Sequence, residues 1–274
     1  MIKIGSHVSF NAPDYLTNSC QTSIENGANT MMIYVGAPQT TRRVSVEKYK
    51  LEEYKQNFSK LIKPEDIIVH APYIINLASI EKGDFAVEFL IEEIKRIDYI
   101  GAKYLVLHPG AHTKFPIDQT LDKLCENLNK VFEKTSNVVI CLETMAGKGT
   151  EICNNFEQIK YVIDKVANER LQICLDTCHL WDAGYNLKNY DEFKKQLIDF
   201  DLLKNVRVIH LNDSLNDLSS HKDRHANIGK GFIGLETLKK FVFDKDFDNI
   251  PIILETPWTD QGPIYKQEIE MLLN

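Results

Sequence analysis

The 274-residue sequence lacks several features that would mark particular classes of protein. It has no run of about 18 apolar residues, which a membrane-spanning helix needs. Its first residues, MIKIGSHVSF, lack the apolar core and small-residue cleavage site of a signal peptide. The six cysteines form no CxxC pair, which argues against a disulfide framework and against a cysteine-rich zinc site. We therefore expect a cytoplasmic protein, not associated with a membrane, whose thiols are reduced and fill the core.

The chain also lacks a low-complexity tract, a long linker and a block of like charge. No domain boundary is visible, so residues 1–274 are expected to form a single domain. The formal net charge of −7 argues, at first sight, against a polyanionic partner. Three bound divalent cations would offset six of these seven charges and would concentrate positive charge in one cleft. The net charge is therefore weak evidence against nucleic-acid binding.

A recurring pattern indicates the fold: a short apolar run, a polar loop and then an amphipathic helical stretch. Helical stretches of this kind occur at 84–100, 121–133 and 156–166. An open doubly wound sheet would lead us to expect a glycine-rich phosphate-binding loop after the first strand, and GSHVSF is not one. Eight repeats in a chain of this length predict a single (β/α)₈ TIM barrel. The expected strands are 2–5, 30–35, 67–70, 104–108, 138–143, 172–176, 206–210 and 251–255.

Six of the eight apolar runs end in a residue that can bind a metal ion. The carboxyl ends of the strands form one face of a TIM barrel, and that face holds the active site. A single histidine there is often bonded to the main chain, and a single carboxylate often caps the next helix. Three of each are not readily explained in this way, so the joint pattern favours a metal site. The six residues are His70, His108, Glu143, Asp176, His210 and Glu255.

Two further segments extend this set. His179 follows Asp176 by three residues, and Asp223 and His225 flank Arg224 in an extended segment, where alternate residues share a side. Nine ligands are too many for one ion but suit three, if one carboxylate bridges. Histidine and carboxylate without thiolate suit Zn²⁺, with Mn²⁺ or Fe²⁺ possible, and argue against Mg²⁺. Clusters of two or three metals are typical of metal-assisted phosphoester hydrolysis.

Three segments resemble the signature motifs of the endonuclease IV family, the metal-dependent AP endonucleases of base-excision repair. They are HAPYIINLA at 70–78, ICLDTCH at 173–179 and HLNDSLNDLSSHKDRH at 210–225, and HPGAH, IGKG and LET fit as well. The resemblance spans essentially the whole chain. It implies a TIM-barrel hydrolase of the deoxyribonuclease IV type, which cuts duplex DNA on the 5′ side of an abasic site. The products are a 3′-hydroxyl and a 5′-deoxyribose phosphate, and the family also removes 3′-blocking groups.

The resemblance also implies a role for each of the nine residues. A hydroxide held between two of the three zinc ions would attack phosphorus, so Glu143 and Glu255, which hold those ions, are the expected catalytic residues. The implied ligands are His70, His108 and Glu143 for the first zinc, Glu143, Asp176, His210 and Glu255 for the second, and His179, Asp223 and His225 for the third.

The family's DNA contacts have counterparts as well. Tyr73 and Ile74 match the residues that enter the duplex where the abasic nucleotide is extruded. Gln39, Arg42 and Arg43 lie in the loop GAPQTTRRV after the second strand and are candidates for contact with the DNA backbone. The expected partner is double-stranded DNA with abasic or 3′-blocked lesions. No obligate protein partner is expected, and a monomer suffices.

The sequence departs from the family pattern in the third motif. Leu215 replaces a lysine that the family commonly has after HLNDS, and Ser219 replaces a glycine. Both changes lie between expected ligands, and they bear on the shape of the loop and on one cationic contact with substrate. Lys222 and Arg224 are candidates to compensate for the missing charge.

Two other functions are compatible with a metal-binding barrel. A two-metal sugar isomerase of the xylose-isomerase-like class would usually carry a catalytic lysine near its metals, and no strand ends in lysine. It would also give His179, Asp223 and His225 no role. A non-catalytic, metal-stabilised DNA-binding module would be expected to have a closed, cysteine-rich site. Both are therefore less suitable than a phosphodiesterase.

Overall fold

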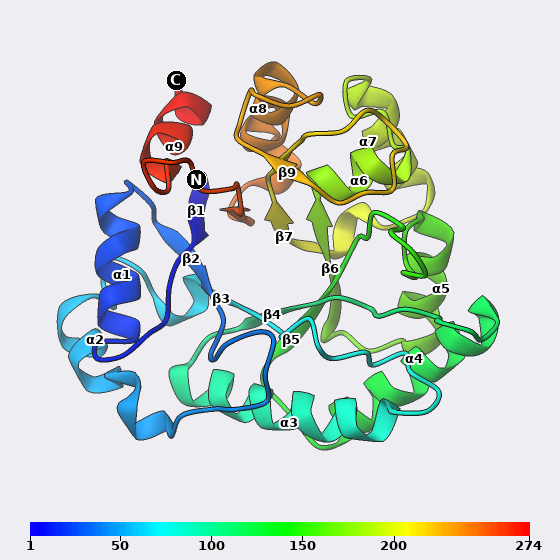
Figure 1. Ribbon diagram of the computed structural model, residues 1–274, viewed down its shortest axis with the longest axis horizontal. Helices are drawn as coiled ribbons and strands as arrows, with labels where there is room; N and C mark the ends of the chain where they lie inside the picture. The colour runs from blue at the N-terminus through cyan, green and yellow to red at the C-terminus, as the bar shows by residue number, and fades with distance from the viewer.

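A computed structural model describes all residues of the chain, 1–274. Eight parallel strands form a closed barrel in chain order, and β1 pairs with β10 to close it, with Lys3 opposite Pro251 and Ser6 opposite Leu254. This confirms the predicted TIM barrel (Figure 1). The barrel strands are β1 (Lys3–His7), β2 (Thr30–Ile33), β3 (Ile67–His70), β4 (Tyr104–Leu107), β5 (Val139–Glu143), β6 (Leu171–Asp176), β7 (Val206–His210) and β10 (Pro251–Leu254).

Helices surround the barrel and bury one face each against it (Figure 1). In α4, for example, Leu121, Leu124, Leu128 and Val131 recur at helical spacing and are buried. None of the helices combines the length and the apolar character that crossing a lipid bilayer requires. The helices are α1 (Leu16–Glu25), α2 (Leu51–Asn57), α3 (Gly83–Ile100), α4 (Ile117–Glu133), α5 (Phe156–Val166), α6 (Thr177–Ala183), α7 (Tyr190–Asp199), α8 (Leu235–Phe243) and α9 (Tyr265–Leu273).

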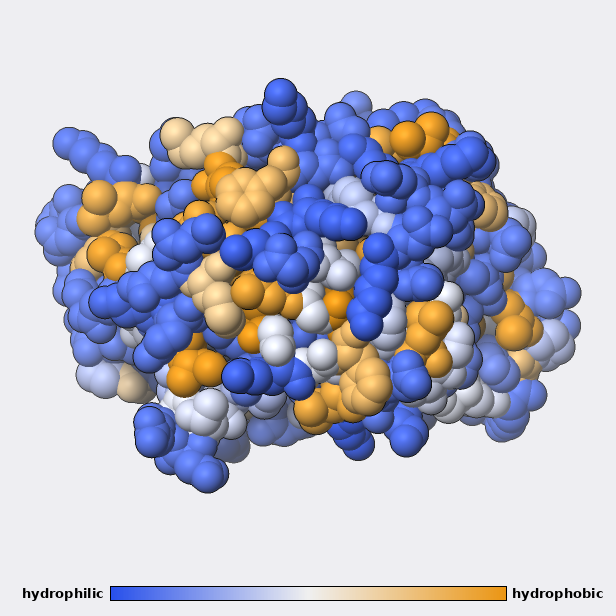
Figure 2. All heavy atoms as spheres, turned by 90° about the horizontal axis from the view of Figure 1, so that it is seen from above, coloured by the Kyte–Doolittle hydropathy of each residue, from blue (hydrophilic) through white to orange (hydrophobic).

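The surface is mainly polar on the face shown in Figure 2, where apolar side chains form small separate patches. The hydrophobic residues are mostly inside, in a large cluster between the barrel and its helices and in a small one within the barrel. The small cluster consists of Met32, Ile68, Val106, Cys141, Cys174, Val208 and Ile253.

The small interior cluster explains where the strand-end residues point. Ile68, Cys141 and Val208 each precede a strand-end residue by two positions, as do Val106, Cys174 and Ile253. Side chains alternate between the two faces of a strand, so residues two apart point the same way. The strand-end histidines and carboxylates therefore extend the interior layer into the mouth of the barrel.

Two short elements lie outside the barrel and complete its mouth. Strands β8 (Asp213–Ser214) and β9 (His225–Ala226) pair in antiparallel fashion and return residues 215–224 to the site. Helix α6 begins directly after β6, so His179 lies in its first turn. The Asp176 carboxylate caps this helix by accepting the His179 main-chain N–H at 2.7 Å.

Candidate metal centre

The carboxylate of Glu143 is the centre around which the histidines gather. Its Oε2 lies 3.2 Å from His70 Nε2 and 3.1 Å from His108 Nε2. Its Oε1 lies 3.1 Å from His210 Nδ1, and the same nitrogen is 3.0 Å from Glu255 Oε2. These residues come from β3, β5 and β7 and from the loops that directly follow β4 and β10, so the barrel assembles them from five parts of the chain.

A second group adjoins the first through Asp176. His179 Nε2 lies 3.1 Å from Asp223 Oδ1, and His225 Nε2 lies 3.6 Å from the same oxygen and 3.8 Å from Asp176 Oδ2. Asp223 also accepts a hydrogen bond from Lys148 Nζ at 2.8 Å. All nine residues named from the sequence therefore lie in one continuous cluster.

The potential donor atoms approach one another closely enough to share metal ions. Four groups have all their donor atoms within 4.8 Å of one another, and they overlap in His70, Glu143, Asp176, His210 and Glu255. These groups are His70, His108 and Glu143; His70, His210 and Glu255; Glu143, Asp176, His210 and Glu255; and Asp176, His179 and His225.

The hydrogen bonds of the histidines fix which ring nitrogen faces the cluster. His70, His179 and His225 each donate Nδ1–H to a main-chain carbonyl, at 2.7, 2.9 and 3.1 Å. This leaves Nε2 of each ring as a lone-pair donor directed at the carboxylates. His225 Nε2 is buried, faces Asp176 and Asp223, and has no hydrogen-bond partner. Because unpaired buried polar atoms are rare, the arrangement fits bound divalent cations.

The cluster is buried on one side and open on the other. Five of its side chains are almost completely inaccessible, whereas His108, Asp223, His225 and Glu255 are 29%, 21%, 20% and 17% exposed. A structural metal site is usually closed, while a catalytic one keeps an open position. The partly exposed residues form the edge through which a substrate could reach the cluster.

The histidines and carboxylates of the cluster shift one another's pKa values. Burial alone would raise the pKa of Glu143, but the imidazoles of His108 and His210 hold it well below its usual range. Burial alone would lower the pKa of His179, but the carboxylates of Asp176, Asp223 and Glu143 hold it well above its usual range. The neighbouring carboxylates likewise raise the pKa of His108 and His210, so without metal the carboxylates favour the protonated form of these three imidazoles. Metal binding must displace these protons, so metal affinity should fall as the pH is lowered.

Most of the expected DNA contacts lie on accessible loops. Tyr73 and Ile74 follow β3 and are 56% and 38% exposed. Gln39 and Arg42 are also exposed. They are therefore available to a ligand that approaches the barrel mouth.

Arg43 differs from its neighbour Arg42. Its side chain is 5% exposed, and its guanidinium forms a bidentate pair with Glu93 of α3, at 2.7 and 3.1 Å. It also lies over the ring of Phe89 and donates to the carbonyls of its own loop. These contacts commit Arg43 to holding loop 36–44 against α3, so the expectation of a direct DNA contact is not supported for this residue.

The two departures from the family motif lie in the loop between β8 and β9. Leu215 is 56% exposed, and its N–H donates to the carbonyl of Arg224 at 2.9 Å. The exposed Arg224 therefore lies directly opposite Leu215 and is placed to supply a nearby positive charge. Ser219 has φ of +63°, in the left-handed region that favours glycine. The loop keeps the backbone shape that a glycine would permit, although a serine occupies the position.

Several buried polar residues that hold the loops of the cluster do not stand out in the sequence. Asp182 of α6 is fully buried and accepts Ser214 Oγ–H and the Asp223 main-chain N–H, both at 2.7 Å. Asp213 accepts four N–H groups of residues 229–234, and Asn212 bridges Asp176 and the main chain of Glu255. None of these residues ends a barrel strand, so the pattern that indicated the candidate ligands could not reveal them.

Asp182 should be required to position Asp223, which is a candidate ligand together with His179 and His225. Asp182→Asn retains the shape but loses one of the two acceptor oxygens, which releases either Ser214 or Asp223. We expect the metal affinity of the site formed by His179, Asp223 and His225 to fall by roughly 10- to 100-fold. Competition with a zinc chelator would measure this change. Asp217→Asn is the control, because Asp217 lies in the same loop but is exposed. Equal metal affinity in the two variants would contradict this role.

The chain is similar to a known protein family and to individual relatives over most of its length. The family model described as xylose isomerase-like TIM barrel matches residues 21–274. A probable endonuclease 4 from Mycoplasmopsis synoviae is 65% identical over 274 residues, covering 100% of this chain and 99% of the relative. A probable endonuclease 4 from Mycoplasmopsis agalactiae is 61% identical over 273 residues, covering 100% and 98%.

Solved structures of the same fold include enzymes of different kinds. Endonuclease IV from Thermus thermophilus superposes with a TM-score of 0.87 at 25% identity, covering 99% of this chain and 98% of that one. A D-tagatose 3-epimerase-like protein gives a TM-score of 0.74 at 21% identity, covering 99% and 96%. The second likeness shows the fold alone.

Proposed function

The chain belongs to the endonuclease IV family of xylose isomerase-like TIM barrels, and from this we propose that it is a DNA-repair phosphodiesterase. It hydrolyses the phosphodiester on the 5′ side of an abasic site in duplex DNA, leaving a 3′-hydroxyl and a 5′-deoxyribose phosphate. It also removes groups that block 3′ ends. The observation that carries this proposal is the cluster of nine histidines and carboxylates, open on one side, at the mouth of the barrel.

We assign three zinc ions to this cluster. The nitrogen and oxygen donors suit Zn²⁺, and Mn²⁺ or Fe²⁺ is compatible with some of the sites. When bound, the ions would supply an acidified water molecule and neutralise charge that develops on the phosphate. The first site would use His70, His108 and Glu143; the second Glu143, Asp176, His210 and Glu255; and the third His179, Asp223 and His225.

The protein's own contribution is to hold these donors in place before substrate binds. The main-chain carbonyls of Ala71, Thr144 and Glu255 fix the tautomers of three histidines. Asn212 fixes Asp176 and the main chain of Glu255. Fixed donors need no reorganisation when charge develops on the substrate, and this is the main source of electrostatic catalysis.

Recognition of the lesion is assigned to Tyr73 and Ile74. They lie three and four residues after His70, in the loop after β3, and expose apolar surface. Side chains inserted into a duplex replace the stacking that is lost when a nucleotide is extruded, and extrusion costs least where no base has to be unstacked. An abasic site therefore offers the nucleotide that is most easily moved to the metal centre.

Tyr73→Ala should reduce incision of an abasic duplex by roughly tenfold or more in kcat/KM, because the extruded state loses an aromatic support. Steady-state cleavage of a duplex with a tetrahydrofuran residue measures this effect. Tyr99→Ala serves as the matched control, since Tyr99 is 42% exposed but lies near the end of α3, next to the start of β4. Unchanged incision by the Tyr73 variant would remove Tyr73 from the proposed mechanism.

The activity itself can be tested by mapping the products from a labelled tetrahydrofuran duplex. The proposal predicts one cut on the 5′ side, with a 3′-hydroxyl that a polymerase can extend. The alternative is a two-metal sugar isomerase built on the same kind of barrel. It predicts interconversion of sugars and no cleavage of DNA, so the two assays separate the functions.

A further inference from the structure

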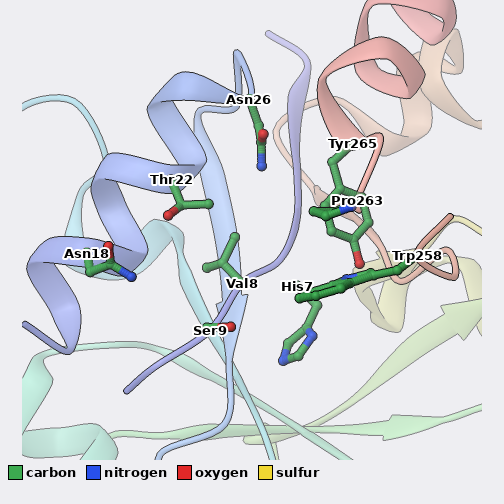
Figure 3. Close-up of a pocket in the computed structure, with 9 residues that line it drawn as sticks. All are labelled: His7, Val8, Ser9, Asn18, Thr22, Asn26, Trp258, Pro263 and Tyr265. Carbon is green, nitrogen blue, oxygen red and sulfur yellow. The ribbon is translucent and has the colours of Figure 1, made fainter. Parts of the chain in front are cut away.

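A pocket of about 440 Å³ lies between α1 and the segment that follows β10 (Figure 3). One wall is aromatic and apolar and is made by Trp258, Pro263 and Tyr265. The opposite wall is the side of α1 that carries Asn18 and Thr22. No lysine, arginine, aspartate or glutamate lines the pocket. It is thus large enough for a small organic ligand and electrically neutral.

The pocket adjoins the candidate metal centre. His7 lines it, and the His7 ring contacts the Tyr34 ring edge-on with centroids 5.2 Å apart. Tyr34 in turn contacts the ring of His70, with centroids 5.0 Å apart. On the other side, Trp258 follows Glu255 by only three residues. A group bound in the pocket would therefore lie beside the edge of the cluster formed by His70 and Glu255.

The polar wall presents hydrogen-bonding groups that have no partner in the protein. On the buried side of α1, Ser19 and Ser23 donate to main-chain carbonyls at 2.6 and 2.8 Å. Asn18, Thr22 and Asn26 are spaced by four residues, so they share the other side of the helix, and their side chains make no hydrogen bond. Figure 3 shows them on the side of α1 that faces the aromatic wall.

Trp258 has the character of a stacking platform. Its side chain is large and apolar, yet it is 68% exposed. Figure 3 shows the indole edge-on, between the Tyr265 hydroxyl and the His7 ring. Exposed aromatic rings beside unpaired amides suit a flat heterocycle with a hydrogen-bonding edge. The absence of cationic residues argues against a phosphate subsite.

We propose that this pocket binds an unpaired nucleobase of the DNA strand, on the nucleotide next to the phosphodiester held at the metal centre. This inference rests on the proposed function, because DNA is the ligand that brings a base to this position. An abasic nucleotide has no base to place there. The pocket should therefore matter for substrates that carry a base, such as a mismatched 3′-terminal nucleotide, and not for incision at an abasic site.

Binding can be tested with 2-aminopurine, whose fluorescence is quenched when it stacks on an aromatic ring. We would place it as an unpaired 3′-terminal base at a nick, with a phosphorothioate at the scissile position to slow cleavage. Metal-loaded protein should quench the probe, Trp258→Phe should retain part of the quenching, and Trp258→Ala should lose it. The control is Phe243→Ala, because Phe243 is 53% exposed but lies on α8, outside the pocket. Equal quenching by all variants would overturn the proposal.

Activity gives an independent test that separates this proposal from the proposed function. Trp258→Ala should lower kcat/KM for removal of a mismatched 3′-terminal nucleotide by roughly tenfold and leave incision of a tetrahydrofuran duplex within about twofold. Thr22→Val keeps the shape of the wall and should lower only the first activity. Equal losses on both substrates, or none on either, would overturn the nucleobase pocket. Absence of incision by the wild-type protein would instead overturn the proposed function.

Discussion

Glu255→Gln should lower incision at an abasic site by about 10³-fold, the scale of losing one fixed electrostatic stabiliser. Binding of the damaged duplex should change little. The substitution preserves the size of the side chain but replaces the charged carboxylate, proposed as a metal ligand, by a neutral amide. Oε2 of Glu255 lies 3.0 Å from His210 Nδ1, so two donor atoms proposed for the second ion lie side by side.

The expected loss of activity depends on the charge of Glu255. Burial alone would raise its pKa, but the imidazole of His210 holds it far below its usual range, so the side chain is ionised at neutral pH. Single-turnover cleavage and equilibrium binding of a tetrahydrofuran duplex would measure the two effects separately. Glu236→Gln, an exposed change in the first turn of α8, is the control. Incision within about tenfold of the wild type would contradict the catalytic assignment of Glu255.

Glu143→Gln should have the second largest effect, because Glu143 contacts four imidazoles. Its carboxylate lies 3.1 to 3.4 Å from ring nitrogens of His70, His108, His179 and His210 and is buried. Loss of the charge removes the proposed bridge between the first and second ions. We expect at least one zinc per chain to be lost and incision to fall by about 10³-fold or more.

The Glu143 variant can be distinguished from a merely unfolded protein. Circular dichroism should show the barrel intact, because the interior layer below Glu143 is apolar and remains packed. Metal analysis by mass spectrometry should show the reduced zinc content. A variant that bound three zinc ions per chain with wild-type affinity would rule out the bridging role.

The barrel and the convergence of the nine candidate ligands could be predicted from the sequence because the strands recur regularly and most end in a histidine or carboxylate. Apolar runs end in His70, Glu143 and His210, and a closed parallel barrel brings all strand ends to one face. The expected strands agree with the observed ones to within two residues at each end. The seven-residue interior layer, two positions before most of these ends, shows why the side chains point inward.

Other parts of the site depend on contacts between distant segments, which a single sequence does not reveal. Arg42 and Arg43 are neighbours of the same type, and only the position of Glu93 on α3 decides that one is buried and the other exposed. Asp182 is indistinguishable in the sequence from a solvated helical carboxylate. Trp258 lines a pocket only because α1, from the opposite end of the chain, forms the facing wall.

The most direct test of the account is the number of zinc ions needed for incision. Chelator-stripped protein would be titrated with Zn²⁺ while bound metal and cleavage of a tetrahydrofuran duplex are measured together. The nine-residue cluster predicts that incision on the 5′ side rises to its maximum as three ions bind per chain. Full activity with fewer than two ions per chain, or no incision by the metal-replete protein, would contradict it.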